Sequence, residues 1–227
     1  MATREPSLQE VLTTSFDYLS AGMHTMIPGI VLTVRDNLSQ MTVDVQPSLN
    51  MRSEDGTEVV ERSPILNVPL VLPISKLGGL TFPVNIGDPV ALIFSMRGLD
   101  VWKRGNGYPS TPSDLRKFDK KDCVAIPGLF PMNISPNNPS AHVLPHSTKD
   151  VVLVHNIGKP SEVEIRLTES GDVRIRAASG KVYVDSDSSF SKDVNIDGTL
   201  TLAGINMNTH VHGGIVPGGS DTNIPKN

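Results

Sequence analysis

Residues 151–209 consist of short stretches in which apolar and polar side chains alternate. Strand-like units begin near Val151, Glu162, Asp172, Lys181, Asp193 and Thr199, and glycines separate them. In the second unit Val163, Ile165 and Leu167 share one face of a strand, and charged residues occupy the other. A narrow meander with one apolar face cannot cover that face by itself.

This pattern predicts an obligate homo-oligomer. Copies of the chain wound about a common axis place the aliphatic residues inside a prism and leave the charged residues in water. Three copies suit such a prism, although the periodicity does not give their number. Aromatic residues make up only 4% of the chain, which also indicates that other copies supply part of the core.

Residues 27–130 predict a small barrel. Apolar and polar residues alternate from Ile30 to Val34, and further apolar runs occupy 65–74 and 89–96, with glycines between the runs. Five or six short strands in this length are typical of an OB-fold-like domain. The expected fold class is therefore all-β.

The segment 1–26 contains the one expected helix, over residues 7–22. Ser7 and Glu10 have the spacing of a capping box, and apolar residues recur at helical intervals after them. Two interpretations stay open: the helix packs on its own domain, or it docks onto a neighbouring component of an assembly.

A polar insertion at about 103–122 interrupts the barrel, and residues 131–150 form a proline-rich linker. Such an insertion is usually a solvated loop, which is the favoured interpretation. The alternative is a docking surface, whose cations are Lys103, Arg104, Arg116, Lys117, Lys120 and Lys121.

Composition and motifs restrict the function. A net charge of −4 argues against a nucleic-acid partner, and the single Cys123 cannot form an intrachain disulfide, as suits assembly in a reducing cytoplasm. No apolar run approaches the roughly 18 residues of a membrane span, so we expect a protein that is soluble when made. The sequence contains none of the common nucleophile, phosphate-loop or metalloprotease motifs, so we expect no enzyme.

His210 and His212 are the candidate metal ligands. Two positions apart on a strand, their imidazoles point to the same face, and three copies about an axis bring together six ring nitrogens. Six imidazoles suit iron(II) or nickel(II) better than zinc, which usually takes four ligands. The alternative is a pair of exposed histidines near a terminus. Residues 210–227 are expected to form a compact apex cap.

Three stretches resemble the central spikes of contractile-tail bacteriophages, the membrane-piercing family of baseplate assembly protein V. Residues 203–225 (AGINMNTHVHGGIVPGGSDTNIP) are similar to the apex of these spikes. VNIDGTLTL resembles the last turns of their β-helix, and PVNIGDPVALIFSMRGLDVW resembles the core of their OB domain.

The resemblance implies a homotrimeric virion component at the baseplate tip of the tail, made in the host cytoplasm. An OB-fold-like domain would precede an intertwined trimeric β-helix over 151–209. His210 and His212 would hold one iron ion per trimer on the threefold axis. The N-terminal region would contact baseplate hub or tail-tube proteins, and the apex would pierce the host outer membrane. The alternatives are the spike of a related injection or secretion apparatus and a tail-associated glycan hydrolase.

Overall fold

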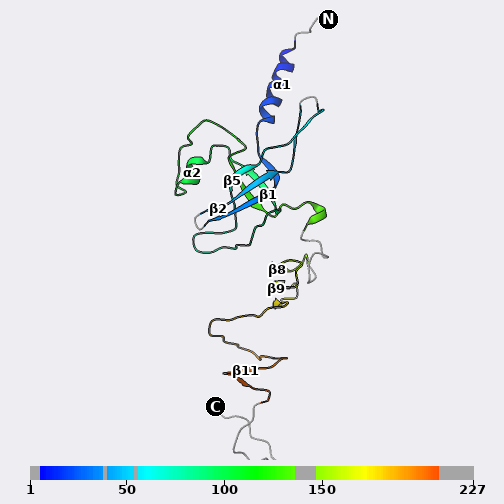
Figure 1. The fold of residues 1–227 in the computed structure, drawn as a ribbon, viewed down its shortest axis with the longest axis vertical. Helices are drawn as coiled ribbons and strands as arrows, with labels where there is room; N and C mark the ends of the chain where they lie inside the picture. The colour runs from blue at the N-terminus through cyan, green and yellow to red at the C-terminus, as the bar shows by residue number, and fades with distance from the viewer. Residues whose placement is uncertain (1–5, 38–39, 54–55, 136–146, 210–227) are drawn as a thin grey trace, which may run out of the picture. The chain divides into compact units, whose positions relative to one another are not determined.

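The computed structural model describes residues 6–37, 40–53, 56–135 and 147–209, and it confirms the prediction of a mostly β chain. The chain divides into two units, residues 1–180 and 181–227. Figure 1 shows the strands of the first unit, with two short helices besides them, α1 (Leu8–Ala21) and α2 (Asp100–Arg104). No helix in the described ranges has the length and apolarity needed to cross a membrane.

Helix α1 begins as the sequence predicts. The Ser7 hydroxyl accepts a hydrogen bond from the Glu10 backbone N–H at 3.3 Å, and the Glu10 carboxylate accepts one from the Ser7 N–H at 2.7 Å. Its apolar side chains are nonetheless exposed, Phe16 at 69% and Leu19 at 68%. The helix therefore forms without burying its apolar stripe, which argues against packing on its own domain.

The largest sheet has the order β5-β2-β1-β6-β7. Its strands are β1 (Met26–Asn37), β2 (Gln40–Pro47), β5 (Ile65–Pro69), β6 (Pro89–Phe94) and β7 (Cys123–Pro127). A parallel bridge joins Leu70 to Ala125, and the Val71 N–H donates to the Ala125 carbonyl at 2.8 Å. The two outer strands therefore approach one another, and the sheet curls into a half-barrel. The two-stranded pair β3 (Met51–Arg52) and β4 (Val59–Val60) and the short η1 (Met132–Ile134) complete this part.

The hydrophobic core of the first unit lies inside this curl. Small aliphatic residues from all five strands dominate it, which fits the aromatic-poor composition: Ile27, Val31, Val43, Val45, Ile65, Val68, Val90, Leu92, Phe94, Cys123 and Ala125. Gly29 allows the close approach of β1 to β2, since a Cβ there would lie 2.5 Å from Val45 Cγ1. A β-bulge between Val31 and Thr33 bends β1.

An ion pair is built into the barrel wall. Arg35 on β1 donates to Asp44 on β2 from Nε at 3.1 Å and from Nη2 at 2.6 Å, and the Asn67 N–H donates to the same carboxylate at 2.9 Å. The hydrogen bond from Arg35 is the main reason why the pKa of Asp44 lies below its ordinary value. Asp44 is buried, so these donors are what keep it charged.

We expect the barrel to lose stability in acid because of such carboxylates. The folded pKa of Asp44 is depressed, so its stabilising contribution is complete above its unfolded pKa of about 3.9 and disappears as the pH falls through the lower folded value. The thermal midpoint should change little between about pH 7 and 5 and then fall below about pH 4. Tryptophan fluorescence follows this barrel transition, because Trp102 is the only tryptophan. Asp44→Asn should lower the midpoint at pH 7 and flatten its decline in acid; an unchanged acid decline would contradict this assignment.

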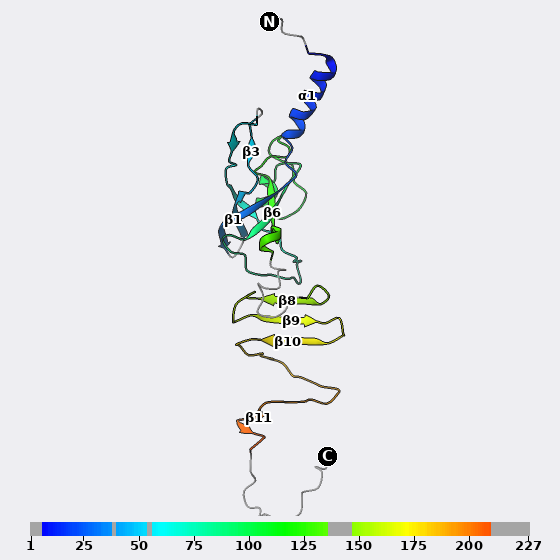
Figure 2. The same ribbon diagram turned by 90° about the vertical axis from the view of Figure 1, so that its right-hand side faces the viewer.

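A second sheet follows, with β8 (Val151–His155), β9 (Val163–Leu167) and β10 (Val173–Ala177) in antiparallel order (Figure 2). In the second unit β11 (Thr201–Leu202) and β12 (Ile205–Asn206) form a short hairpin. The units expected near Lys181 and Asp193 form no strand within the described part of the chain. Alternation alone does not make a strand, because a strand also needs a neighbour to pair with its backbone.

Candidate functional site

The sheet β8-β9-β10 presents one apolar face, defined by three rows of cross-strand neighbours. The strand register aligns these rows across all three strands: Val151–Leu167–Val173, Leu153–Ile165–Ile175 and His155–Val163–Ala177. Directly opposed side chains in antiparallel strands touch one another, so the first two rows are continuous apolar bands, and the third is apolar except for His155. The predicted alternation from Val163 to Leu167 is confirmed in β9.

This apolar face is uncovered. The exposed fractions are 50% for Leu153, 44% for Ile165 and 59% for Ile175 in the middle row, and the outer residues Val151 and Val173 are more exposed still. Fully burying a side chain of this kind contributes about 1.5–3 kcal/mol. A contiguous apolar surface of this type marks an association site. The apolar face is therefore the candidate functional site of residues 147–180.

The opposite face of the same sheet carries a compact ion cluster. Arg166 donates to Asp150 at 2.9 Å and to both oxygens of Glu164 at 3.1 and 3.0 Å. The side chains are only 12%, 13% and 8% exposed, respectively. The expectation that the charged residues of β9 face water is therefore wrong in the folded chain. Arg166 lies between the two carboxylates, and the three groups satisfy one another instead of water.

The electrostatics of this cluster favour its charged form. The Glu169 backbone N–H and then Arg166 hold the pKa of Asp150 below its ordinary value, and Glu164 and then Asp150 raise the pKa of Arg166. Glu162, also fully buried, accepts a hydrogen bond from the Gly158 N–H at 2.8 Å. The charged groups on one face of this sheet therefore find their partners within the chain, whereas the apolar face has no covering layer among the described residues.

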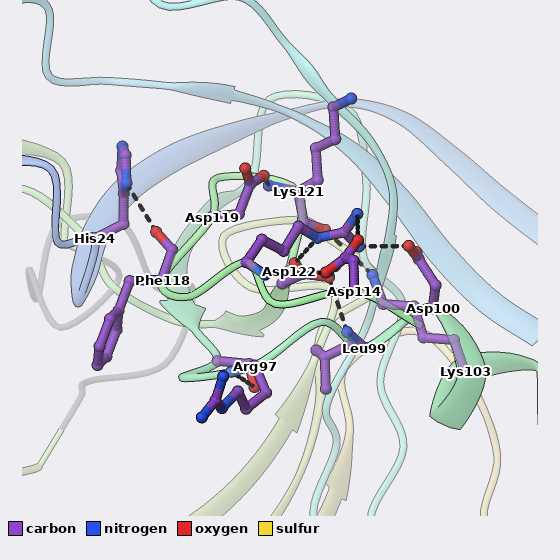
Figure 3. A network of polar contacts seen from close by, with 12 residues as sticks. His24, Arg97, Leu99, Asp100, Lys103, Asp114, Phe118, Asp119, Lys121 and Asp122 are labelled. Carbon is purple, nitrogen blue, oxygen red and sulfur yellow. Dashed lines mark hydrogen bonds and ion pairs between the residues drawn. The ribbon is translucent and has the colours of Figure 1, made fainter. Parts of the chain in front are cut away.

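The insertion near 103–122 is anchored by a second ion cluster around Arg116, whose acidic partners Asp100, Asp114 and Asp122 are labelled in Figure 3. Arg116 donates from Nε to Asp122 at 2.6 Å and from Nη1 to Asp114 at 2.9 Å, and it also contacts Asp100. The Asp122 side chain is 1% exposed and accepts a hydrogen bond from the Leu99 N–H at 2.8 Å. The interpretation of the insertion as a plain solvated loop is therefore wrong at Arg116, which joins Asp100 at the start of α2 to Asp122, the residue before β7.

The charge of Asp122 depends on these donors. Burial alone raises the pKa of this carboxyl, but the hydrogen bonds from Arg116 and from the Leu99 N–H outweigh burial and bring the pKa below its ordinary value. Arg116 in turn has a raised pKa because of Asp122 and Asp100. The cluster therefore stays ionised at neutral pH.

We expect Arg116→Ala to destabilise the barrel by about 3 kcal/mol, because it leaves the Asp122 carboxylate buried without its cation. Urea denaturation followed by Trp102 fluorescence measures this change. Lys117→Ala is the matched control: its side chain is exposed, and we expect a change below about 0.5 kcal/mol. Equal midpoints for the two variants would show that the cluster around Arg116 contributes nothing to stability.

The predicted metal ligands His210 and His212 lie outside the described residues, as do His142 and His146. His24 contacts the Phe118 carbonyl at 3.0 Å and the Arg62 guanidinium at 3.2 Å. Within the described ranges, no group of three or more His, Cys, Asp or Glu side chains could hold a metal ion. Cys123 is buried, and burial raises its pKa to about 11, so it is not a reactive thiol.

Comparison with known proteins locates a family resemblance in the barrel. Residues 27–128 match the family model described as the phage protein Gp138 N-terminal domain. The matched range begins in β1 and ends one residue after β7, so it coincides with the curled sheet. No curated protein sequence matches the chain. The match supports a phage protein and, more broadly, a structural component of the virion.

Proposed function

We propose that the chain is the central spike of a contractile phage tail, a non-enzymatic homotrimer that pierces the host outer membrane when the sheath contracts. The apolar face of β8, β9 and β10 is the observation that carries this proposal. It belongs to a chain whose barrel resembles a phage protein domain. The family match supports the part of the proposal that concerns a phage structural protein. The uncovered apolar face supports the part that concerns an oligomeric spike.

Three copies can bury three such faces against one another. A prism with three walls encloses all the apolar faces and leaves the cluster around Arg166 outside, where its charged groups are already paired within the chain. A two-copy sandwich also covers the faces, but it leaves two open sheet edges on each copy, whereas a closed prism joins them. The three-walled arrangement therefore accounts for more of what the single chain leaves unfinished.

The segment after β10 supports the same arrangement. Val182 and Val184, and then Val194 and Ile196, alternate with polar residues, yet all four are about half exposed and lie outside any strand. Strands that pair with neighbouring copies satisfy both their backbone groups and their apolar side chains. In this proposal, residues 181–200 complete an intertwined β-helix that continues the prism.

The proposed mechanism depends on stiffness. Backbone hydrogen bonds between copies make a β-helix resist bending, so sheath contraction can transmit force along it to the bilayer. His210 and His212 from three copies supply six imidazole nitrogens, a donor set that suits a single iron(II) ion. A metal joining the three chains at the apex would prevent their ends from separating under load.

The N-terminal helix is the proposed attachment point to the baseplate hub or tail tube. Its exposed stripe, which includes Leu8, Leu12, Phe16 and Leu19, is unburied in the single chain. An isolated helix of 14 residues is marginal in water, so α1 gains stability when this stripe meets a partner.

Immunogold electron microscopy tests the proposed function. Antibodies raised against the purified chain should label the distal tip of the contractile tail of the phage that encodes it. Labelling of the head, the sheath or the tail fibres would overturn the assignment as a central spike, even if the chain were a trimer.

A further inference from the structure

A cavity of about 760 Å³ lies on the barrel, between the strand pair β2–β5 and the insertion that follows β6. We call it the basic groove. Met41 and Leu66 come from the strands, and Trp102 and Lys103 come from α2. Small five-stranded barrels bind oligosaccharides and oligonucleotides with their second and third strands and the loop between the fourth and fifth. In the five-stranded sheet, β2 and β5 are the second and third strands in chain order, and the insertion joins the fourth strand, β6, to the fifth, β7. The basic groove lies between these same parts, and its volume falls within the range of ligand sites.

The rim of the basic groove is strongly cationic. Four of its lining residues are basic, namely Lys103, Arg104, Lys120 and Lys121. These four cations outnumber the single lining carboxylate, Asp100, which also contacts Arg116. Four positive charges therefore converge on one cavity of a chain whose net charge is −4.

The apolar part of the groove lining includes one aromatic ring. Trp102 is 47% exposed, Met41 40% and Leu66 60%. Trp102 is the only aromatic lining residue of this groove and the only tryptophan in the chain. An exposed indole presents a flat surface to a ligand, and its apolar neighbours extend that surface.

The cluster around Arg116 holds the lining of the groove in place before any ligand binds. Asp122 receives the Leu99 N–H just before α2, and Arg116 joins Asp122 to Asp100, the first residue of α2. The Lys103 ammonium also donates to the Lys121 carbonyl at 3.4 Å. Both cationic segments of the rim are thus held against the barrel, which lowers the conformational cost of binding.

We propose that the basic groove binds a phosphate-bearing oligosaccharide. A phosphate monoester, with about −1.5 to −2 charges, supplies the anion that these lining cations attract, and a sugar ring stacks on Trp102. A neutral sugar would offer these cations no anionic group. Single-stranded nucleic acid is disfavoured, because such sites stack successive bases on several aromatic side chains and this groove has one.

Trp102 reports on its own site, so a fluorescence titration of the full-length protein tests the proposal. The probe is a phosphorylated core oligosaccharide released from bacterial lipopolysaccharide. Its dephosphorylated form and an eight-residue oligothymidylate are the comparison ligands. We expect the phosphorylated probe to quench Trp102 fluorescence in a saturable manner. The double variant Lys120→Ala/Lys121→Ala should bind this probe about tenfold more weakly than the unaltered protein. Lys117→Ala, in the same insertion but outside the groove, should bind like the unaltered protein.

Several results would overturn the proposal. One is Trp102 emission that does not change when the phosphorylated probe is added. The others are equal affinity for the phosphorylated and dephosphorylated sugars, and a double variant that binds the probe as tightly as the unaltered protein. Tighter binding of oligothymidylate would identify a nucleic-acid site instead. The side chains of Lys120 and Lys121 make no hydrogen bond that the barrel needs among the described contacts, so their removal should leave the fold intact. The titration is independent of trimer formation and of metal at the apex, and its failure leaves the proposed function untouched.

Discussion

Ile165→Asp is expected to convert the proposed trimer into monomers. Ile165 lies on the central strand and in the middle row of the apolar face, between Leu153 and Ile175. In a three-walled prism the substitution places three carboxylates in one apolar interior, where each unpaired charge costs several kcal/mol. Size-exclusion chromatography with light scattering should show loss of the trimer even at high protein concentration.

The matched control is Lys159→Asp, which introduces the same side chain at an exposed position of the loop between β8 and β9. This control should remain trimeric. Emission of Trp102 confirms in both variants that the barrel is folded, since this tryptophan lies outside the second sheet. A trimer that survives Ile165→Asp would show that the apolar face is not the association surface.

The second large effect is expected at the apex. Purified protein should contain about one iron per three chains, and His210→Ala/His212→Ala should contain none. The substitutions remove all six proposed nitrogen ligands but leave the apolar face intact. The trimer should therefore persist, with reduced resistance to thermal dissociation. Elemental analysis by mass spectrometry measures the metal, and light scattering measures the mass.

His142→Ala/His146→Ala is the control for this experiment, because it removes the same number of histidines from another part of the chain. It should retain the iron of the unaltered protein. Stoichiometric iron in the His210/His212 variant would exclude this pair as the metal ligands. A different metal at the same stoichiometry would correct the identity of the ion and keep the site.

Local signals in the sequence predicted the local structure well. The Ser7 and Glu10 capping box marks the start of α1, because both hydrogen bonds are made within one turn. The alternation from Val163 to Leu167 predicted the two faces of β9, because side chains of a strand alternate by geometry alone. In both cases a few neighbouring residues contain all the information that the structure needs.

Long-range contacts explain what the sequence did not predict. Arg116 looked like one more cation of a solvated loop, but the fold brings Asp100, 16 residues before it, and Asp122, 6 residues after it, into contact with its guanidinium. Arg166 was expected in water, and only the folded sheet brings Asp150 beside it. The strands expected near Lys181 and Asp193 need neighbours that the single chain does not supply among its described residues.

Sedimentation equilibrium of the unaltered, full-length protein tests the central claim most directly. The spike predicts a single species of three times the chain mass of 24.4 kDa, unchanged over a wide range of concentrations. A species of 24.4 kDa would contradict it, because the apolar face of β8, β9 and β10 would then stay in water.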